Sequence, residues 1–184
     1  MKLSFSNVLL VICLIITLIS FNIEEMYIFW MNNYFLDRWL YHVYFFQFFS
    51  STFIHWSILH LLMNSVFLVF FWNIVEKILW YKNMIIFYIF AAVFVWLWIS
   101  YFSNWNTVWM SGFLMALLSY YTLYLYDKND PEYKWWVTAI FVSVIIWLDP
   151  GISFYWHFFG SIAWILFFLF NKKFLKKQYI GVVE

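Results

Sequence analysis

The chain has 184 residues, of which 67% are hydrophobic, 29% aromatic and only 10% charged. Soluble domains are about a quarter charged and about half apolar, so this composition excludes a water-soluble protein, and we expect no additional soluble domain. The net charge is +1, and no extended basic patch lies outside the tail. This distribution argues against a nucleic-acid partner. The single cysteine, Cys13, allows no intrachain disulfide and offers no metal-site spacing, so the sequence predicts neither a metal ion nor a cofactor.

The first predicted element is an uncharged apolar stretch over residues 3–23. A helix needs about 20 apolar residues to cross about 30 Å of hydrocarbon, so this stretch predicts a membrane span. Only Lys2 precedes it and no small-residue cleavage site follows, which favours an anchor over a removed signal peptide. Residues 24–54 then mix charged side chains with many aromatic rings. That mixture suits the headgroup boundary, and we predict a long loop lying on or partly in the membrane.

Five further spans follow, separated by charged or polar segments. The uncharged stretch 83–126 is about twice as long as one span needs to be, and a polar segment at residues 103–107 divides it. The predicted spans cover residues 55–76, 83–102, 111–126, 135–148 and 153–170. We therefore expect an all-α polytopic membrane protein with six transmembrane helices, forming a single membrane domain over residues 1–184.

Lysine and arginine are distributed unevenly between the two sides of this predicted topology. With six spans, nine of these residues fall on one side and only Arg38 falls on the other. Cytoplasmic loops carry an excess of Lys and Arg, so both termini are predicted to be cytoplasmic.

Four polar side chains are predicted to lie in the outer part of the membrane. His60 and Asn64 are four residues apart and share one helical face, roughly 8 to 14 Å below the outer surface. Ser111 opens one span and His157 lies near the start of the last one, each after an outer loop. Polar and ionisable side chains inside a span are costly and are usually functional, so these four mark a candidate site.

Together these residue types favour acyl transfer. A serine hydroxyl attacks a carbonyl with the help of a neighbouring base, usually an imidazole, and the resulting oxyanion needs donors such as an amide, a second imidazole or a helix-start N–H. Small residues such as Gly112 and Gly160 allow two helices to approach closely. Each feature also has a simpler explanation: a membrane serine bonds to its own backbone, a His–Asn pair joins helices, and small residues are ordinary packing. Their conjunction on one side of the membrane favours the catalytic interpretation.

Three short motifs resemble those of the rhomboid intramembrane serine proteases. The stretch FIHWSILHLLMN, with His55, His60 and Asn64, resembles the family pattern HxxxxHxxxN. The stretch WMSGFLMALLSYY, with Ser111, resembles the GxSG block, and YWHFFG, with His157, resembles the AHxxG block. The motifs stand in the family's order.

The resemblance spans about residues 45–170 and implies a rhomboid-like bundle that hydrolyses peptide bonds in or near transmembrane helices. It implies Ser111 as nucleophile and His157 as base, with the Ser111 N–H, His60 and Asn64 binding the oxyanion. The supporting residues that it implies are His55, Glu76, Gly112 and Gly160. The expected partners are transmembrane protein substrates and the lipid bilayer, and the lack of a targeting segment favours a bacterial inner membrane.

The chain departs from the family pattern at several positions without losing a reacting group. The first glycine of GxSG is Trp109, and an aromatic residue usually found four residues after the serine is Met115. A common Trp-Arg pair of the first loop falls at Phe46-Gln47, and two small residues of the bundle are replaced by Trp72 and Trp164.

Two other classes of function compete with the protease. A rhomboid-like pseudoprotease binds transmembrane helices without cutting them, but such relatives usually lose the serine or the histidine, and this chain keeps both. A small transporter or channel should carry charged residues near the membrane midplane, and predicted spans three to six contain none. The protease is therefore the leading hypothesis and the transporter the last.

Overall fold

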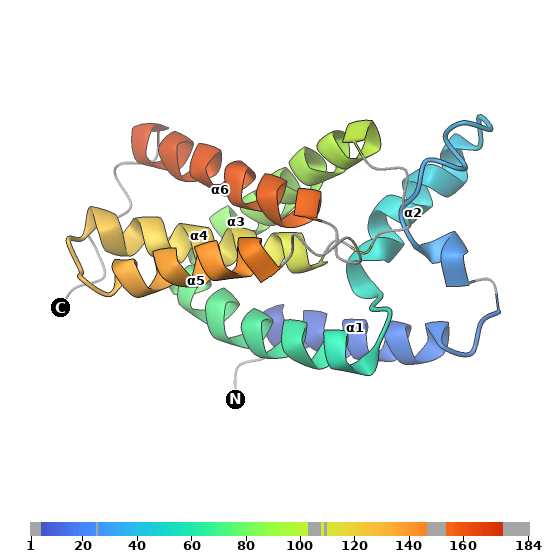
Figure 1. Cartoon of the computed structure of the whole chain (residues 1–184), viewed down its shortest axis with the longest axis horizontal. Coiled ribbons are helices and arrows are strands. Elements are labelled where there is room, and N and C mark those ends of the chain that lie inside the picture. The colour runs from blue at the N-terminus through green and yellow to red at the C-terminus, as the bar shows by residue number, and fades with distance from the viewer. Residues whose placement is uncertain (1–4, 25, 103–107, 109, 147–153, 175–184) are drawn as a thin grey trace.

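The computed structural model describes residues 5–24, 26–102, 108, 110–146 and 154–174, and every regular element within these residues is a helix. The elements are α1 (Phe5–Ser20), the 3₁₀ helix η1 (Met26–Phe29), α2 (Tyr41–Phe53), α3 (Ile58–Phe102), α4 (Met110–Asp127), α5 (Tyr133–Ile146) and α6 (Phe154–Phe174) (Figure 1). The predicted all-α class is confirmed. The six membrane crossings and the side of each terminus stay predictions.

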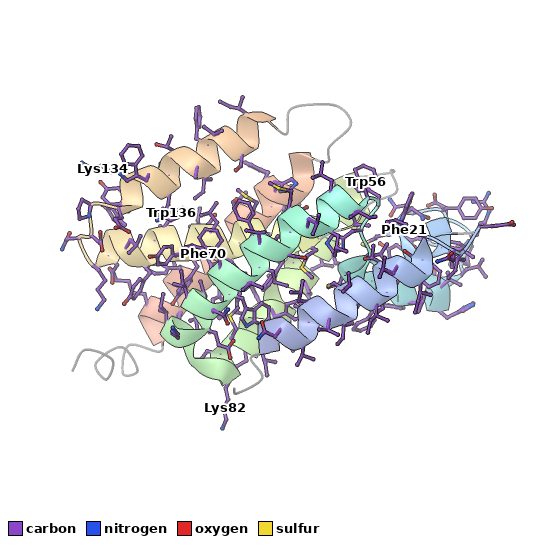
Figure 2. All side chains as sticks on the ribbon, turned by 90° about the horizontal axis from the view of Figure 1, so that it is seen from below. Phe21, Trp56, Phe70, Lys82, Lys134 and Trp136 are labelled. Carbon is purple, nitrogen blue, oxygen red and sulfur yellow. The ribbon has the colours of Figure 1, made fainter. Side chains whose placement is uncertain are left out.

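Helix α3 differs from the prediction of two helices separated after residue 76. Its backbone stays helical throughout, yet the helix folds back on itself. Trp72 and Tyr88 would lie about 24 Å apart along a straight helix, but their ring centroids are 6.1 Å apart. The residues between the predicted spans include neither proline nor glycine, so nothing there stops helical hydrogen bonding. Lys82 projects from the bend (Figure 2), which shows that the charged residues mark the bend and not a break.

The other helices begin and end within a few residues of the predicted spans. Helix α4 covers Met110–Asp127 against the predicted 111–126, and α5 covers Tyr133–Ile146 against 135–148. Residues 149–152, between the last two predicted spans, lie outside the described residues.

The predicted loop between the first two spans contains the helix α2, which the sequence analysis did not anticipate. Gln47 and Ser51 are fully buried on one face of α2, whereas Phe45 and Phe49 are exposed on the other. A helix that turns polar side chains toward the protein and aromatic rings outward suits an apolar environment better than water. The place of this segment in the membrane boundary stays a prediction.

The directions of the packed helices bring two of the sequence motifs, on α4 and α6, to the same end of the bundle. Helices α4 and α6 run parallel, the second half of α3 runs antiparallel to α6, and α5 runs antiparallel to α4. The contacts that set these directions are Tyr120–Trp164 and Asp127–Lys172 between α4 and α6, Phe87–Phe167 and Trp98–Phe159 between α3 and α6, and Tyr121–Trp136 and Tyr126–Tyr133 between α4 and α5. The parallel pair places the first turns of α4 and α6 at the same end of the bundle.

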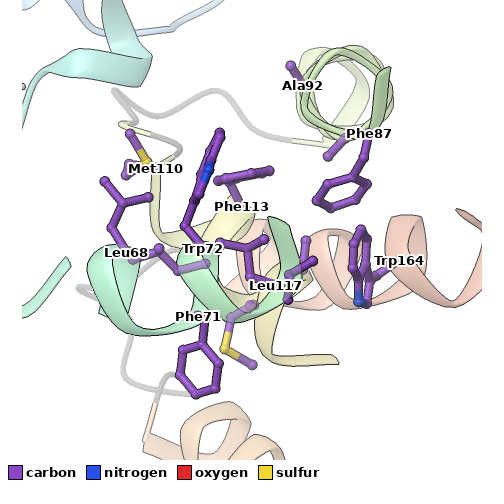
Figure 3. Packing of buried hydrophobic residues seen from close by; sticks show 14 of the residues in the cluster. Leu68, Phe71, Trp72, Phe87, Ala92, Met110, Phe113, Leu117 and Trp164 are labelled. Atoms are coloured by element: carbon purple, nitrogen blue, oxygen red, sulfur yellow. The ribbon is translucent and has the colours of Figure 1, made fainter. Parts of the chain in front are cut away.

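A core of aromatic and aliphatic side chains fills the space between α3, α4 and α6 (Figure 3). Trp72 and Trp164 are the largest fully buried side chains, and both are completely shielded. Trp72 contacts Phe113, and Phe113 stacks on Phe87 at a centroid distance of 5.5 Å. These tryptophans occupy two positions where the family pattern has small residues, so large rings fill the centre of the bundle.

The outer surface is strongly apolar. Among the described residues, Ile58–Leu79 is long and apolar enough to cross a membrane, and Asn7–Ser20 and Lys82–Trp98 are shorter apolar stretches. Lys82 and Lys134 lie toward one end of the long axis, and Trp56 and Phe21 lie toward the other (Figure 2). Exposed apolar surface of this extent marks contact with lipid or with other proteins.

Candidate active site

Ser111 and His157 meet at the adjoining first turns of α4 and α6. The Oγ atom of Ser111 lies 3.4 Å from Nε2 of His157, and the two residues are only 9% and 3% exposed. The distance lies at the long end of a hydrogen bond, as is common for catalytic pairs before substrate binds. A buried hydroxyl facing an imidazole is the arrangement that a serine nucleophile and its base require.

A glycine on α6 makes this meeting possible. A Cβ atom added at Gly160 would lie 2.2 Å from the carbonyl oxygen of Gly112, which is far inside van der Waals contact. The two backbones therefore touch directly beside Ser111 and His157. Glycine is needed at residue 160 because of this close approach.

His60 and Asn64 lie on α3 and form a second polar pair. Nε2 of His60 is 3.1 Å from Nδ2 of Asn64, as expected for side chains one helical turn apart. Asn64 is buried and His60 is partly buried. His60 also interacts electrostatically with His157, which places the pair on the same side of the bundle as the serine and the histidine. The structure thus brings the four predicted residues into one region.

A family model, the Rhomboid domain, matches residues 42–173. The chain belongs to the rhomboid family. It is therefore a membrane protein from a family of serine intramembrane proteases. No curated protein matches the chain.

Of the supporting rhomboid positions, His55 lies in the segment between α2 and α3. It is 1% exposed, and its Nδ1 lies 3.3 Å from Oγ1 of Thr17 on α1. Its ring packs edge-on against His60 with a centroid distance of 5.1 Å. His55 therefore joins α1 to the residues of the site. Thr17 was missed in the sequence analysis, because a lone hydroxyl in an apolar stretch has no motif around it.

Glu76 lies one helical turn after Trp72, close to the bend of α3. Its Oε2 accepts a hydrogen bond of 2.7 Å from Nε1 of Trp72. This bond satisfies the indole of a fully buried tryptophan, which would otherwise be costly. The contact joins two residues of the same helix next to the reversal of the chain.

The departures from the rhomboid pattern are accommodated in different ways. Met115 is buried among the hydrophobic residues of α4. Gln47 is fully buried, and its Oε1 accepts a hydrogen bond of 3.4 Å from the backbone N–H of Asn32. Trp109 lies outside the described residues. Gln47 thus provides an uncharged polar link between α2 and the segment before it.

The chemistry of the site can be described from its side chains and backbone groups. Among the described residues, no group of three or more His, Cys, Asp or Glu side chains is arranged to hold a metal ion. The polar groups of the site are one hydroxyl, one amide and the imidazoles, together with the backbone N–H groups at the start of α4. These are the groups from which acyl-transfer sites are built.

Proposed function

We propose that the protein is an intramembrane serine endopeptidase that cleaves peptide bonds in or near the transmembrane segments of membrane proteins. The observation that carries the proposal is the buried contact between Ser111 Oγ and His157 Nε2, at 3.4 Å. Membership of the rhomboid family supports it.

In the proposed reaction, Oγ of Ser111 attacks the carbonyl carbon of the substrate while Nε2 of His157 takes the hydroxyl proton. The negative charge on the carbonyl oxygen is stabilised by the N–H of Ser111 and by the amide of Asn64, which His60 holds in place. His157 then gives its proton to the leaving amine. Water, activated by the same imidazole, hydrolyses the acyl-enzyme and restores the serine.

The proposed setting is a bilayer, most simply a bacterial inner membrane, with six spans and both termini in the cytoplasm. The distribution of Lys and Arg along the chain supports this orientation. The separation of Lys82 and Lys134 from Trp56 along the long axis is compatible with it (Figure 2). Transmembrane proteins would be the substrates and lipid the surrounding medium.

Labelling with a fluorophosphonate, which reacts with activated serines, tests the proposal in detergent. The wild type should be labelled, and Ser111→Ala and His157→Ala should not. Ser119→Ala is a matched control, because Ser119 is a second buried serine of α4 and should leave labelling unchanged. Labelling that persists in a folded Ser111→Ala protein would contradict the assignment.

A rhomboid-like pseudoprotease that binds transmembrane helices is the second candidate. The replacements at Met115 and Gln47 favour it, since they remove two side chains that family members commonly have. A folded wild type that shows no labelling would support this alternative.

A further inference from the structure

A hydroxyl on α1 begins a chain of polar contacts that leads to the site. Oγ1 of Thr17 lies 3.1 Å from the carbonyl oxygen of Phe53 and 3.3 Å from Nδ1 of His55. The ring of His55 packs edge-on against His60, and Nε2 of His60 lies 3.1 Å from the amide nitrogen of Asn64. Each member of the chain from Thr17 to Asn64 is at least partly buried.

The proton count at Thr17 determines the tautomer of His55. A threonine hydroxyl has a single hydrogen, and a carbonyl oxygen can only accept, so the hydrogen of Thr17 goes to Phe53. The oxygen of Thr17 must then accept from His55. The proton of His55 therefore sits on Nδ1, and its Nε2 carries a lone pair.

The same reasoning applies to His60. The amide group of Asn64 donates to Nε2 of His60, so the proton of a neutral His60 sits on Nδ1. Nε2 of His55 and Nδ1 of His60 are both buried and have no hydrogen-bond partner among the described residues. Nε2 of His55 is therefore an acceptor and Nδ1 of His60 a donor. The centroids of the two rings are 5.1 Å apart. A small rotation of either ring would let this donor and this acceptor meet.

We infer that Thr17 is a positioning residue for the oxyanion side of the site, an inference that rests on the proposed function. Its hydroxyl holds His55 in one tautomer, and His55 in turn favours one tautomer of His60. His60 then engages one N–H of Asn64 and leaves the second N–H of that amide for the oxyanion. Thr17 contacts neither the nucleophile nor its base and acts only through the two imidazoles.

The labelling rate with a fluorophosphonate provides the first test. Thr17→Val keeps the shape of the side chain and removes the hydroxyl, and Thr17→Ser keeps the hydroxyl. Displacing an oxyanion donor costs less than deleting it, so Thr17→Val should label about tenfold more slowly, and Thr17→Ser should restore most of the rate. Thr122→Val is the matched control, because Thr122 is also buried but donates only to Leu118 of its own helix, at 2.8 Å. It should label like the wild type.

Side-chain nitrogen NMR of the histidines provides a second test. It reads the tautomer of His55, which a purely structural role of Thr17 would not change. The chain has four histidines, so the signals of His55 are identified by their loss in His55→Gln. In the wild type His55 should carry its proton on Nδ1. In Thr17→Val the population of this tautomer should fall but not vanish, because the carbonyl oxygen of Phe53 also accepts from this ring, whatever the change in melting temperature.

The outcomes separate this inference from the proposed function. Wild-type labelling rates in Thr17→Val, or a proton on Nε2 of His55 in the wild type, would overturn the role of Thr17. A folded wild type without labelling would overturn the proposed protease, while the NMR result would still decide the tautomer of His55. If Thr17→Val does not fold, the wild-type spectrum and the rate of Thr17→Ser decide the inference.

Discussion

Helices α4 and α6 pack against each other in two different ways along their length. In the glycine region, formed by Gly112 and Gly160, the two backbones touch without any intervening side chain. In the aromatic region, two turns further along α4 and one turn further along α6, Tyr120 packs on Trp164 with a centroid distance of 4.4 Å. The first region brings a hydroxyl and an imidazole together, and the second fills volume.

The comparison explains which small residues of the family pattern can be replaced here. Gly160 faces the backbone of Gly112, where any side chain collides. Position 164 faces the rings of Phe87 and Tyr120, which leave room for an indole when they are arranged around it. A small residue is therefore indispensable beside the reacting groups and exchangeable in the middle of the bundle. The two regions should respond differently to mutation, in stability and in labelling.

The largest effect on stability is expected for Trp164→Ala. This change deletes one of the largest fully buried side chains and should lower the free energy of unfolding by about 3–5 kcal/mol. The fluorophosphonate labelling rate of the folded fraction should stay that of the wild type. Unfolding in detergent followed by tryptophan fluorescence measures the first quantity. Leu169→Ala, on the exposed face of α6, is the control and should change stability little. A loss of labelling in folded Trp164→Ala would show that the two regions are coupled.

Gly160→Ala should have a smaller effect on stability and a larger one on reactivity. The added Cβ would force α4 and α6 apart, at a cost of about 1–3 kcal/mol. Since a displacement of about 1 Å can cost about a hundredfold in rate, labelling of Ser111 should fall by about that factor. Ile165→Ala is the control, because its side chain is exposed on α6. Wild-type labelling in Gly160→Ala would show that the close approach is not what aligns the dyad.

The sequence was sufficient to predict the helical class and the contact between Ser111 and His157. Hydrophobic stretches bounded by charged or polar residues predict the helix ends to within a few residues, because the length of a membrane span is fixed. The meeting of Ser111 with His157 was predictable because parallel helices put their first turns at one end. Whether these residues catalyse hydrolysis is still a prediction.

Two features were not predicted. The continuous helix α3 bends by aromatic packing between residues far apart in sequence, such as Trp72 and Tyr88, and a charge pair does not distinguish a bend from a break. Helix α2 buries Gln47 and Ser51 on its inner face. Because polar residues are not expected inside a bundle, its mixture of polar and aromatic residues was interpreted as a boundary loop. The alternation of polar and aromatic residues at helical spacing was the available signal.

Glu76→Gln tests a polar contact within the aromatic part of α3. The amide keeps an acceptor for Nε1 of Trp72 but loses the charge that strengthens the bond. The free energy of unfolding should fall by about 1 kcal/mol, with labelling unchanged. Glu132→Gln, at an exposed position between α4 and α5, is the matched control. A loss of labelling without a loss of stability would assign Glu76 a role at the site.

The smallest effect is expected at the far end of the α4–α6 pair, where Asp127 and Lys172 form an ion pair. Both side chains are substantially exposed, at 40% and 52%, so water and salt screen their attraction. A double-mutant cycle with Asp127→Asn and Lys172→Gln should give a coupling of less than about 1 kcal/mol. High salt should reduce this coupling further. A larger, salt-resistant coupling would mean that this end, and not only the aromatic region, holds the two helices parallel. The α4–α6 pair would then have three regions with separate roles instead of two.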